Sequence, residues 1–252
     1  MCEFLIECGA DLDAETHHGM NALKFAVGCD THRTKHGSYR GQIANLPIVK
    51  LLIKCGAKQH AQCEWDGSTL LHYACEHVEI EVVEYLLEHS GDSLNVQDKW
   101  GKSPLLHCLS RWGQSFIHAR LTDQLKIVRL LVDNGEEVDG LDNYGRTPLM
   151  NAIRDMQVGP QMIKLLVELG ANVKYTDDSN NTVLSLLANP QLTSTSKKKN
   201  PCEIIKLLVE LGADVNHTNG RESILGEFKH YWSRSQQFGE IVECLKALGA
   251  KE

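Results

Sequence analysis

The hydrophobic pattern of the chain is dominated by one phrase, in which a pair of aliphatic residues is followed by a short gap and then by glycine, often with alanine next. The glycines of successive copies are 47, 35, 44, 35, 42 and 37 residues apart, which indicates a minimal unit of 35 residues that carries insertions. The seven copies end at Gly9, Gly56, Gly91, Gly135, Gly170, Gly212 and Gly249.

A second phrase lies upstream of each copy of the first. Its clearest form is Gly-Arg-Thr-Pro-Leu at 145–149. The copy at 67–74 continues to a His and an Ala, and the copy at 101–105 keeps the Pro. Weaker copies begin at Asn21, Thr182 and Ser223. Thr before Pro-Leu is a good helix N-cap, and Pro is favoured at the first helical position. The second phrase therefore predicts the start of a helix.

The first phrase predicts the end of another helix. Residues 80–88 and 162–168 carry apolar side chains at three- and four-residue spacing, as amphipathic helices do. The glycine that follows suits a left-handed C-cap. Between one glycine and the next Thr the chain is polar and rich in turn residues, as at 139–145, which predicts a hairpin-like connection. Each unit is thus expected to be a pair of helices that buries its apolar face against neighbouring pairs.

These two phrases together resemble the ankyrin-repeat family, whose period is 33 residues and whose first helix begins with a Thr-Pro-Leu-His-x-Ala phrase. The resemblance covers essentially the whole chain and implies an all-α solenoid of stacked helix pairs with hairpin-like turns. We expect a single domain over residues 1–252, with a half repeat at 1–14 whose helix spans 1–8 and which either marks a longer array or caps this one. The six complete repeats are expected at about 15–62, 63–97, 98–141, 142–176, 177–217 and 218–252.

Four longer insertions, at about 31–42, 111–122, 190–201 and 229–238, separate the two helices of a pair. The family implies that all four project from one edge. They hold ten Lys or Arg and no Asp or Glu, so the rest of the chain has 16 basic against 33 acidic residues. One interpretation is a basic edge that attracts an acidic partner, opposite acidic hairpins that contain Asp98, Asp142, Asp177 and Asp178. The other is that Lys and Arg solvate loops while Asp serves turn geometry.

Composition sets the class of protein. A content of 42% hydrophobic and 23% charged residues is typical of a folded chain, and no apolar run approaches the length of a membrane span. The nine cysteines are scattered, and Cys75, Cys108 and Cys244 occupy apolar helix positions, which favours free thiols in a reducing compartment. The net charge of −7 argues against a nucleic-acid partner. We therefore expect an intracellular, cytoplasmic protein without membrane insertion.

Aromatic residues near the turn glycines are the best candidates for partner contacts. Trp100 and Tyr144 stand just before the turn glycine of consecutive repeats, and Trp65 lies one residue earlier in the preceding repeat. Ankyrin repeats commonly contact partners through hairpin tips and the inner face of the first helix, and Trp, Tyr and Arg are enriched in binding hot spots. The alternative is that each ring packs on its own hairpin. Matching positions add Lys99, Lys102, Arg146, Glu76, His77, Arg154 and Asp155 to the candidate binding residues.

The histidines have mainly structural interpretations. His72 stands where the family phrase has its His, which implies a hydrogen bond between loops, whereas His107 is displaced by one position. Cys29, His32 and His36 form a C-x2-H-x3-H spacing that could hold zinc, but no fourth ligand is evident. A polar loop is the favoured interpretation there, and we predict no metal or other cofactor.

No catalytic motif is present: there is no phosphate-binding glycine loop, no zinc-protease His-Glu pair and no nucleophile elbow. The sequence therefore predicts a scaffold that is not an enzyme and that binds a protein or peptide through its hairpin tips and concave helix face. The alternative is the substrate-recognition part of a larger enzyme complex or multidomain protein. A metal-binding loop at Cys29 is a minor alternative.

Overall fold

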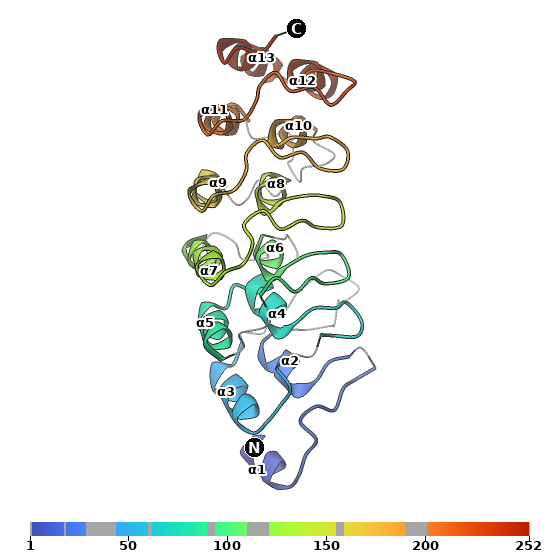
Figure 1. Cartoon of the computed structure of the whole chain (residues 1–252), viewed down its shortest axis with the longest axis vertical. Coiled ribbons are helices and arrows are strands. Elements are labelled where there is room, and N and C mark those ends of the chain that lie inside the picture. The colour runs from blue at the N-terminus through green and yellow to red at the C-terminus, as the bar shows by residue number, and fades with distance from the viewer. Residues whose placement is uncertain are drawn as a thin grey trace. The chain divides into compact units, whose positions relative to one another are not determined.

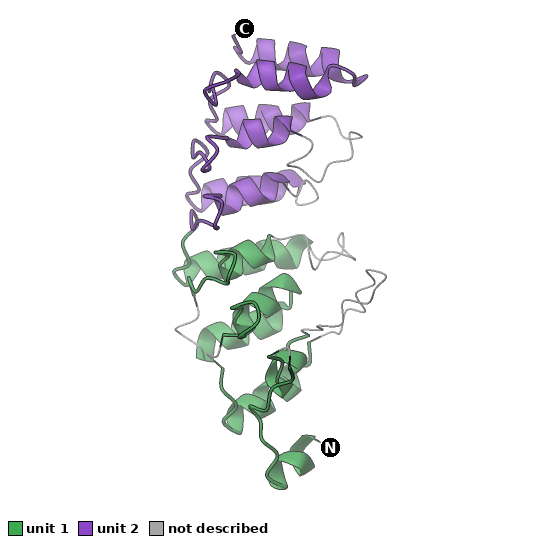
Figure 2. Ribbon diagram, turned by 90° about the vertical axis from the view of Figure 1, so that its right-hand side faces the viewer, with its two compact units in different colours: residues 1–137 green, residues 138–252 purple. Residues whose placement is uncertain are grey.

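The computed structural model describes residues 2–17, 19–28, 44–59, 62–89, 94–109, 121–154, 159–189 and 201–251. The chain divides into two compact units, residues 1–137 and 138–252, which are coloured separately in Figure 2. Within the described ranges the secondary structure is helical, apart from one isolated bridge between Thr218 and Ser223. The assignment of the chain to a single domain stays a prediction.

Unit 1 contains one leading helix and three helix pairs. Its first helix, α1, spans Cys2–Glu7, close to the predicted half repeat. In Figure 1 the shorter helices α2, α4 and α6 form one column beside the hairpins, and α3, α5 and α7 form a second column. The bounds of the paired helices are α2 Ala22–Ala26, α3 Leu46–Lys54, α4 Leu70–Glu76, α5 Ile80–His89, α6 Pro104–Cys108 and α7 Leu121–Asp133.

Unit 2 repeats this arrangement with three further pairs. The inner helices beside its hairpins are α8, α10 and α12, and their partners are α9, α11 and α13 (Figure 1). The bounds are α8 Pro148–Arg154, α9 Gly159–Glu168, α10 Val183–Ala188, α11 Cys202–Glu210, α12 Ile224–Trp232 and α13 Phe238–Ala247. The predicted six helix pairs are thus confirmed within the part of the chain that the structure describes.

The weak copies of the second phrase work as helix starts. Asn21, Thr182 and Ser223 each accept a hydrogen bond through the side chain from a backbone N–H three residues later, as an N-cap does. The aliphatic pairs of the first phrase supply the core, since Leu131 and Leu166 are completely buried. Gly170 ends α9 at φ +103°, a conformation that L side chains rarely adopt. The physical interpretation of both phrases is therefore confirmed.

The insertion predicted at 229–238 differs from the structure. Residues 229–232 continue α12, and only the following residues form a turn. The reason is Trp232, whose ring is buried and whose Nε1–H donates to the carbonyl of Ala188 at 2.8 Å. That hydrogen bond caps the C-terminal end of α10 and stabilises the additional turn of α12. The other three predicted insertions lie almost wholly outside the described residues, as do the basic residues of the predicted edge except Lys229 and Arg234.

A buried glutamate, Glu136, follows Gly135, where other copies of the first phrase have alanine after the glycine. Glu136 Oε1 accepts the backbone N–H of Leu105 at 2.7 Å, so its carboxylate caps the first turn of α6 from 31 residues away. Burial raises the pKa of Glu136 to about 7, against the opposing hydrogen bonds from Ser103 and Leu105. The cap on α6 therefore requires a carboxyl group that is unfavourable to ionise where it is buried.

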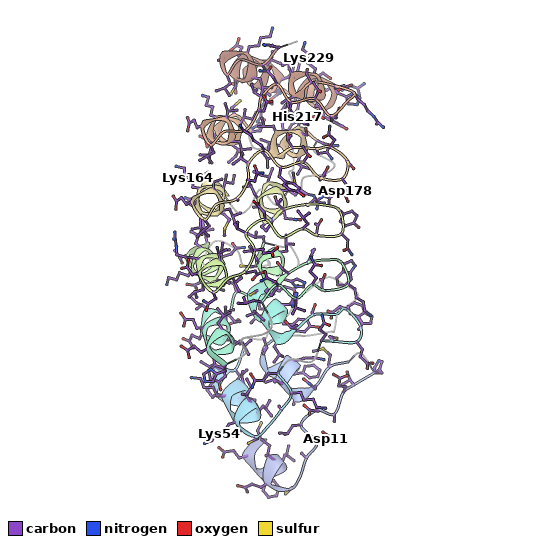
Figure 3. All side chains as sticks on the ribbon, in the orientation of Figure 1. Asp11, Lys54, Lys164, Asp178, His217 and Lys229 are labelled. Carbon is purple, nitrogen blue, oxygen red and sulfur yellow. The ribbon has the colours of Figure 1, made fainter. Side chains whose placement is uncertain are left out.

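We predict that Leu166→Ala lowers the free energy of unfolding by about 2–5 kcal/mol, because it leaves a cavity in a closed core. Lys164 lies on the same helix, exposed to solvent and labelled in Figure 3, and Lys164→Ala should change stability by less than about 0.5 kcal/mol. Urea unfolding of both variants checks this. Equal effects would contradict the burial of this face of α9.

We predict that Glu136→Gln stabilises the protein increasingly as the pH rises. The folded-state pKa of about 7 exceeds the ordinary value of 4.5, so the wild type loses stability between those two pH values as the unfolded chain ionises first. The amide keeps an acceptor for the Leu105 N–H and does not ionise. Urea unfolding at pH 4.5 and pH 8 should show the advantage of the variant growing by up to about 3 kcal/mol. An advantage that does not change with pH would contradict the raised pKa.

Candidate binding surface

The hairpins of unit 1 expose a pair of tryptophans. The side chain of Trp65 is 65% exposed and that of Trp100 is 46% exposed, and their ring centroids lie 6.4 Å apart in an edge-to-face arrangement. The two rings thus contact each other across adjacent hairpins and still present a large apolar area to solvent. Exposed rings of this size at neighbouring tips are what a binding hot spot requires.

Backbone hydrogen bonds hold these tips in place. Asp98 Oδ1 accepts the backbone N–H groups of Trp100 and Lys102, both at 2.8 Å. The N–H of Lys99 donates to the carbonyl of Asp66 in the preceding hairpin at 2.9 Å. Trp100 is therefore carried on a fixed turn that is bonded to its neighbour.

The same device recurs in unit 2, where Asp142 Oδ1 accepts the N–H groups of Tyr144 at 2.9 Å and Arg146 at 3.0 Å. Asp177 holds Ser179 and Asn181 in the same way. Three of the four acidic hairpin residues singled out in the sequence therefore serve turn geometry, while Asp178 is exposed on its hairpin, as Figure 3 shows.

In three of the described repeats, a residue six positions after the turn glycine connects the inner helix (α4, α6 or α8) to a hairpin carboxylate. The hydroxyl of Tyr73 donates to Asp66, His107 Nε2 bonds Asp98 Oδ2 at 2.8 Å, and Asn151 Nδ2 donates to Asp142. All three side chains are buried. Sequence reasoning missed this role, although the alignment of the three positions behind the glycine was a signal that could have revealed it.

His72 has the structural role expected from the family phrase. Its Nδ1 accepts the N–H of Thr69 at 3.0 Å, so its Nε2–H donates to the carbonyl of Lys102 at 3.0 Å in the next hairpin. Burial and the nearby charge of His107 lower its pKa to about 4. The ring is therefore neutral at pH 7, as these two bonds demand.

His107 has the opposite electrostatics. Its ring lies between two carboxylates, with Nε2 bonded to Asp98 and Nδ1 3.6 Å from Glu76 Oε2. Burial disfavours the charged ring, but the hydrogen bond to Asp98 and the charge of Glu76 outweigh it and raise the pKa of His107. The pKa values of both carboxyl groups are lowered in turn, against their own burial.

In unit 2, Tyr144 is 58% exposed at its tip and the Arg146 guanidinium lies over its ring, 4.7 Å from the centroid. Arg154, at the end of α8, is half-buried on the same repeat. The aromatic position before the turn glycine is thus exposed in both units, and a cation accompanies it in unit 2.

The structure separates the predicted binding residues into groups. Trp65, Lys99 and Trp100 share the tips of unit 1, with half-buried Lys102 beside them. The side chain of Glu76 is directed toward His107 rather than toward solvent. The next residue, His77, is the C-cap of α4 and is half-buried. Asp155 lies outside the described residues.

The proposed metal loop with Cys29, His32 and His36 also lies outside the described residues. Where side chains are described, no group of three or more His, Cys, Asp or Glu is placed to hold a metal ion. Cys75, Cys108 and Cys244 are free thiols and are buried, as expected. None of the helices found in the described ranges is long and apolar enough to cross a membrane.

The chain belongs to the ankyrin-repeat family, because the family model for ankyrin repeats in three copies matches residues 39–121 and 111–177, more than half of the sequence. Family members are generally modules for protein–protein interaction, and the fold is typically not enzymatic. The predicted family and all-α solenoid fold are thereby confirmed.

Several relatives share this repeat. The chain is 30% identical over 157 residues to the transient receptor potential cation channel subfamily A member 1 of Drosophila melanogaster, which covers 61% of this chain and 11% of the relative. It is 32% identical over 134 residues to the B-cell lymphoma 3 protein homolog of Mus musculus, covering 52% of this chain and 27% of the relative. The chain therefore spans roughly a quarter or less of the length of these relatives.

Among solved structures, the human ASB11 ankyrin repeat domain superposes with a TM-score of 0.70 at 20% identity, covering 99% of this chain and 92% of that domain. This likeness establishes the shared fold.

We predict that His107→Asn lowers stability most at pH 6 and progressively less as the pH rises. A His pKa raised in the folded state stabilises fully below its unfolded value of 6.5, and this stabilisation is lost as the pH passes the folded value. Asn can still reach the hairpin carboxylate, as Asn151 does. Thermal or urea unfolding at pH 6 and pH 9 should show a gap of about 1–3 kcal/mol at the lower pH.

The matched control is His89→Asn, because His89 is exposed at the end of α5. It should show little gap from wild type at either pH. A gap for His107→Asn that stays constant from pH 6 to pH 9 would contradict the raised pKa of His107.

Proposed function

We propose that this chain binds a protein or peptide partner through its hairpin tips and the inner faces of its first helices. The exposed Trp65–Trp100 pair is the observation that carries the proposal. Large apolar rings cost free energy when they face water, and here the fold places two of them together rather than burying them.

The rigidity of the tips supports the same function. The backbone around Trp100 is already held by Asp98 and by the preceding hairpin, so little conformational entropy is lost when a partner docks. Tyr144 is held by Asp142 in the same way. Preorganised aromatic side chains of this kind are efficient anchors because most of their contact area is gained without ordering a loop.

The alternative role, as the substrate-recognition part of a larger enzyme complex, would use the same surface. The two roles differ only in whether a catalytic or adaptor component works together with these repeats. The alternative role stays a prediction.

The test is capture of binding partners by the intact protein and by a Trp100→Ala/Tyr144→Ala double variant. We expect the double variant to lose specific partners, because each substitution removes an exposed anchor without removing a buried contact. Phe4→Ala is the matched control, since Phe4 is 65% exposed on α1, away from the hairpins. It should retain every partner. Retention of all partners by the double variant would refute the proposal.

Salt separates the tips from the predicted basic edge. Binding through desolvated aromatic rings should vary little between low and high salt, whereas binding through exposed lysines should weaken steeply. A variant with Lys197→Ser, Lys198→Ser and Lys199→Ser should therefore keep its affinity. If only this lysine variant loses binding, and wild-type affinity falls sharply with salt, the basic edge is the site.

A further inference from the structure

The imidazole of His107 connects two consecutive repeats of unit 1. Its Nε2 lies 2.8 Å from Oδ2 of Asp98, in the hairpin of its own repeat. Its Nδ1 lies 3.6 Å from Oε2 of Glu76, the last residue of α4 in the preceding repeat. The ring is buried, and the Asp98 side chain is fully buried. A single enclosed ring therefore contacts one carboxylate from each repeat.

The same two repeats carry the exposed tryptophan pair. Asp98 uses Oδ2 for His107 and Oδ1 for the backbone N–H of Trp100. Trp65 lies in the hairpin that leads into α4, the helix that ends at Glu76. The two indole rings contact each other with centroids 6.4 Å apart. The imidazole thus links the two repeats from inside, and the indole rings meet outside.

Only a protonated imidazole can donate toward both carboxylates, because a neutral ring has one N–H and one acceptor nitrogen. The short contact with Asp98 keeps the remaining hydrogen on Nε2 when the ring loses its proton. The lone pair of Nδ1 then faces the carboxylate of Glu76, and no described residue gives this nitrogen a hydrogen bond. Deprotonation therefore replaces an attraction between the two repeats with a repulsion.

The charged and titratable groups around His107 come from three parts of unit 1. They are His72 and Glu76 on α4, Asp98 and Lys102 in the hairpin, and Glu136 after α7. Burial disfavours the charged ring, but Asp98 and Glu76 outweigh burial and raise the pKa of His107 above its ordinary value of 6.5. The contact with both repeats is therefore complete below pH 6.5 and is lost as the pH rises through the folded-state value.

We infer that His107 is a pH-sensitive tie between the repeats that carry Trp65 and Trp100, and that partner binding by this pair weakens when the ring loses its proton. The inference rests on the proposed function and adds its regulation. The N–H of Lys99 still donates to the carbonyl of Asp66 at 2.9 Å, so the hairpin backbones stay bonded and the change is a local displacement. A partner that selects the tied arrangement binds more tightly where the ring is protonated.

The experiment follows the ring ¹³C–¹H signals of Trp65, Trp100 and His107 in the intact protein from pH 5 to pH 10. Both tryptophan signals should shift along the titration curve of His107 and share its midpoint. Trp232 is the internal control, because its Nε1–H donates to the carbonyl of Ala188 in unit 2. Its signal should not follow that curve. The inference is overturned if either Trp65 or Trp100 fails to follow His107.

Glu76→Gln removes the carboxylate that faces Nδ1 and should lower the midpoint of His107, and the Trp100 midpoint should move with it. His107→Asn should abolish the titration of Trp100. Glu136→Gln is the matched control, because the pKa of Glu136 is about 7 and its charge acts on His107. In that variant the two midpoints should still coincide. A Trp100 midpoint that stays fixed while that of His107 moves, or a Trp100 titration that survives in His107→Asn, contradicts the tie.

Partner capture tests the regulation. The ratio of partner captured by wild type to partner captured by His107→Asn should fall about fivefold or more between pH 6 and pH 9. Titration of the partner itself affects both proteins alike, so it cancels in this ratio. A constant ratio would show that the proton on His107 does not control binding, and the inference would fail.

The outcomes separate this inference from the proposed function. If the Trp100→Ala/Tyr144→Ala variant loses no partner while the tryptophan signals follow His107, the tie stands and the aromatic-tip function is wrong. If that variant loses its partners while the tryptophan signals do not follow His107, the function stands and the tie is wrong.

Discussion

Burial of apolar surface between neighbouring helix pairs is the constraint on which everything else in this protein depends. The inner helices from α2 to α10 are only one or two turns long, as α6 with Pro104–Cys108 shows, and isolated helices of that length are not stable in water. Each therefore exists because the adjacent pair covers its apolar face. Within a unit, this stacking also sets the distance between successive hairpins, and so it decides which polar groups of one repeat can reach the next.

The polar contacts are consequences of that spacing. His72 reaches the carbonyl of Lys102, and His107 lies between Asp98 of its own hairpin and Glu76 of the preceding repeat. The pKa values of two adjacent imidazoles, whose ring centroids lie 4.8 Å apart, are thereby shifted in opposite directions. The pKa is lowered for His72, which bonds a backbone carbonyl, and raised for His107, which lies between two carboxylates. A buried ion cluster of this kind sits directly behind the tip that displays Trp100, so the electrostatics of the interior support the binding surface.

Local signals allowed much of this to be predicted from the sequence. The helix pairs and the helix starts near Asn21 and Ser223 follow from residues close together in the chain. The missed features depend on residues far apart. Glu136 caps a helix 31 residues earlier, and Trp232 extends α12 because it bonds a carbonyl 44 residues away. Glu76 was expected to face a partner, but its position nine residues after Gly67 gave no sign of the histidine that the next repeat places beside it.

The hairpin aspartates fix the backbone of each turn without constraining the side chain that the turn displays. In three repeats the residue two positions after the Asp donates its backbone N–H to that carboxylate, yet the side chains are Trp100, Tyr144 and Ser179. The bond uses only main-chain atoms of that residue, so the fold accepts an indole, a phenol or a hydroxymethyl group there without adjustment. The proposed binding surface can therefore be changed one side chain at a time on an unchanged backbone, and a library of variants at these positions would alter its chemistry while leaving the stacked core intact.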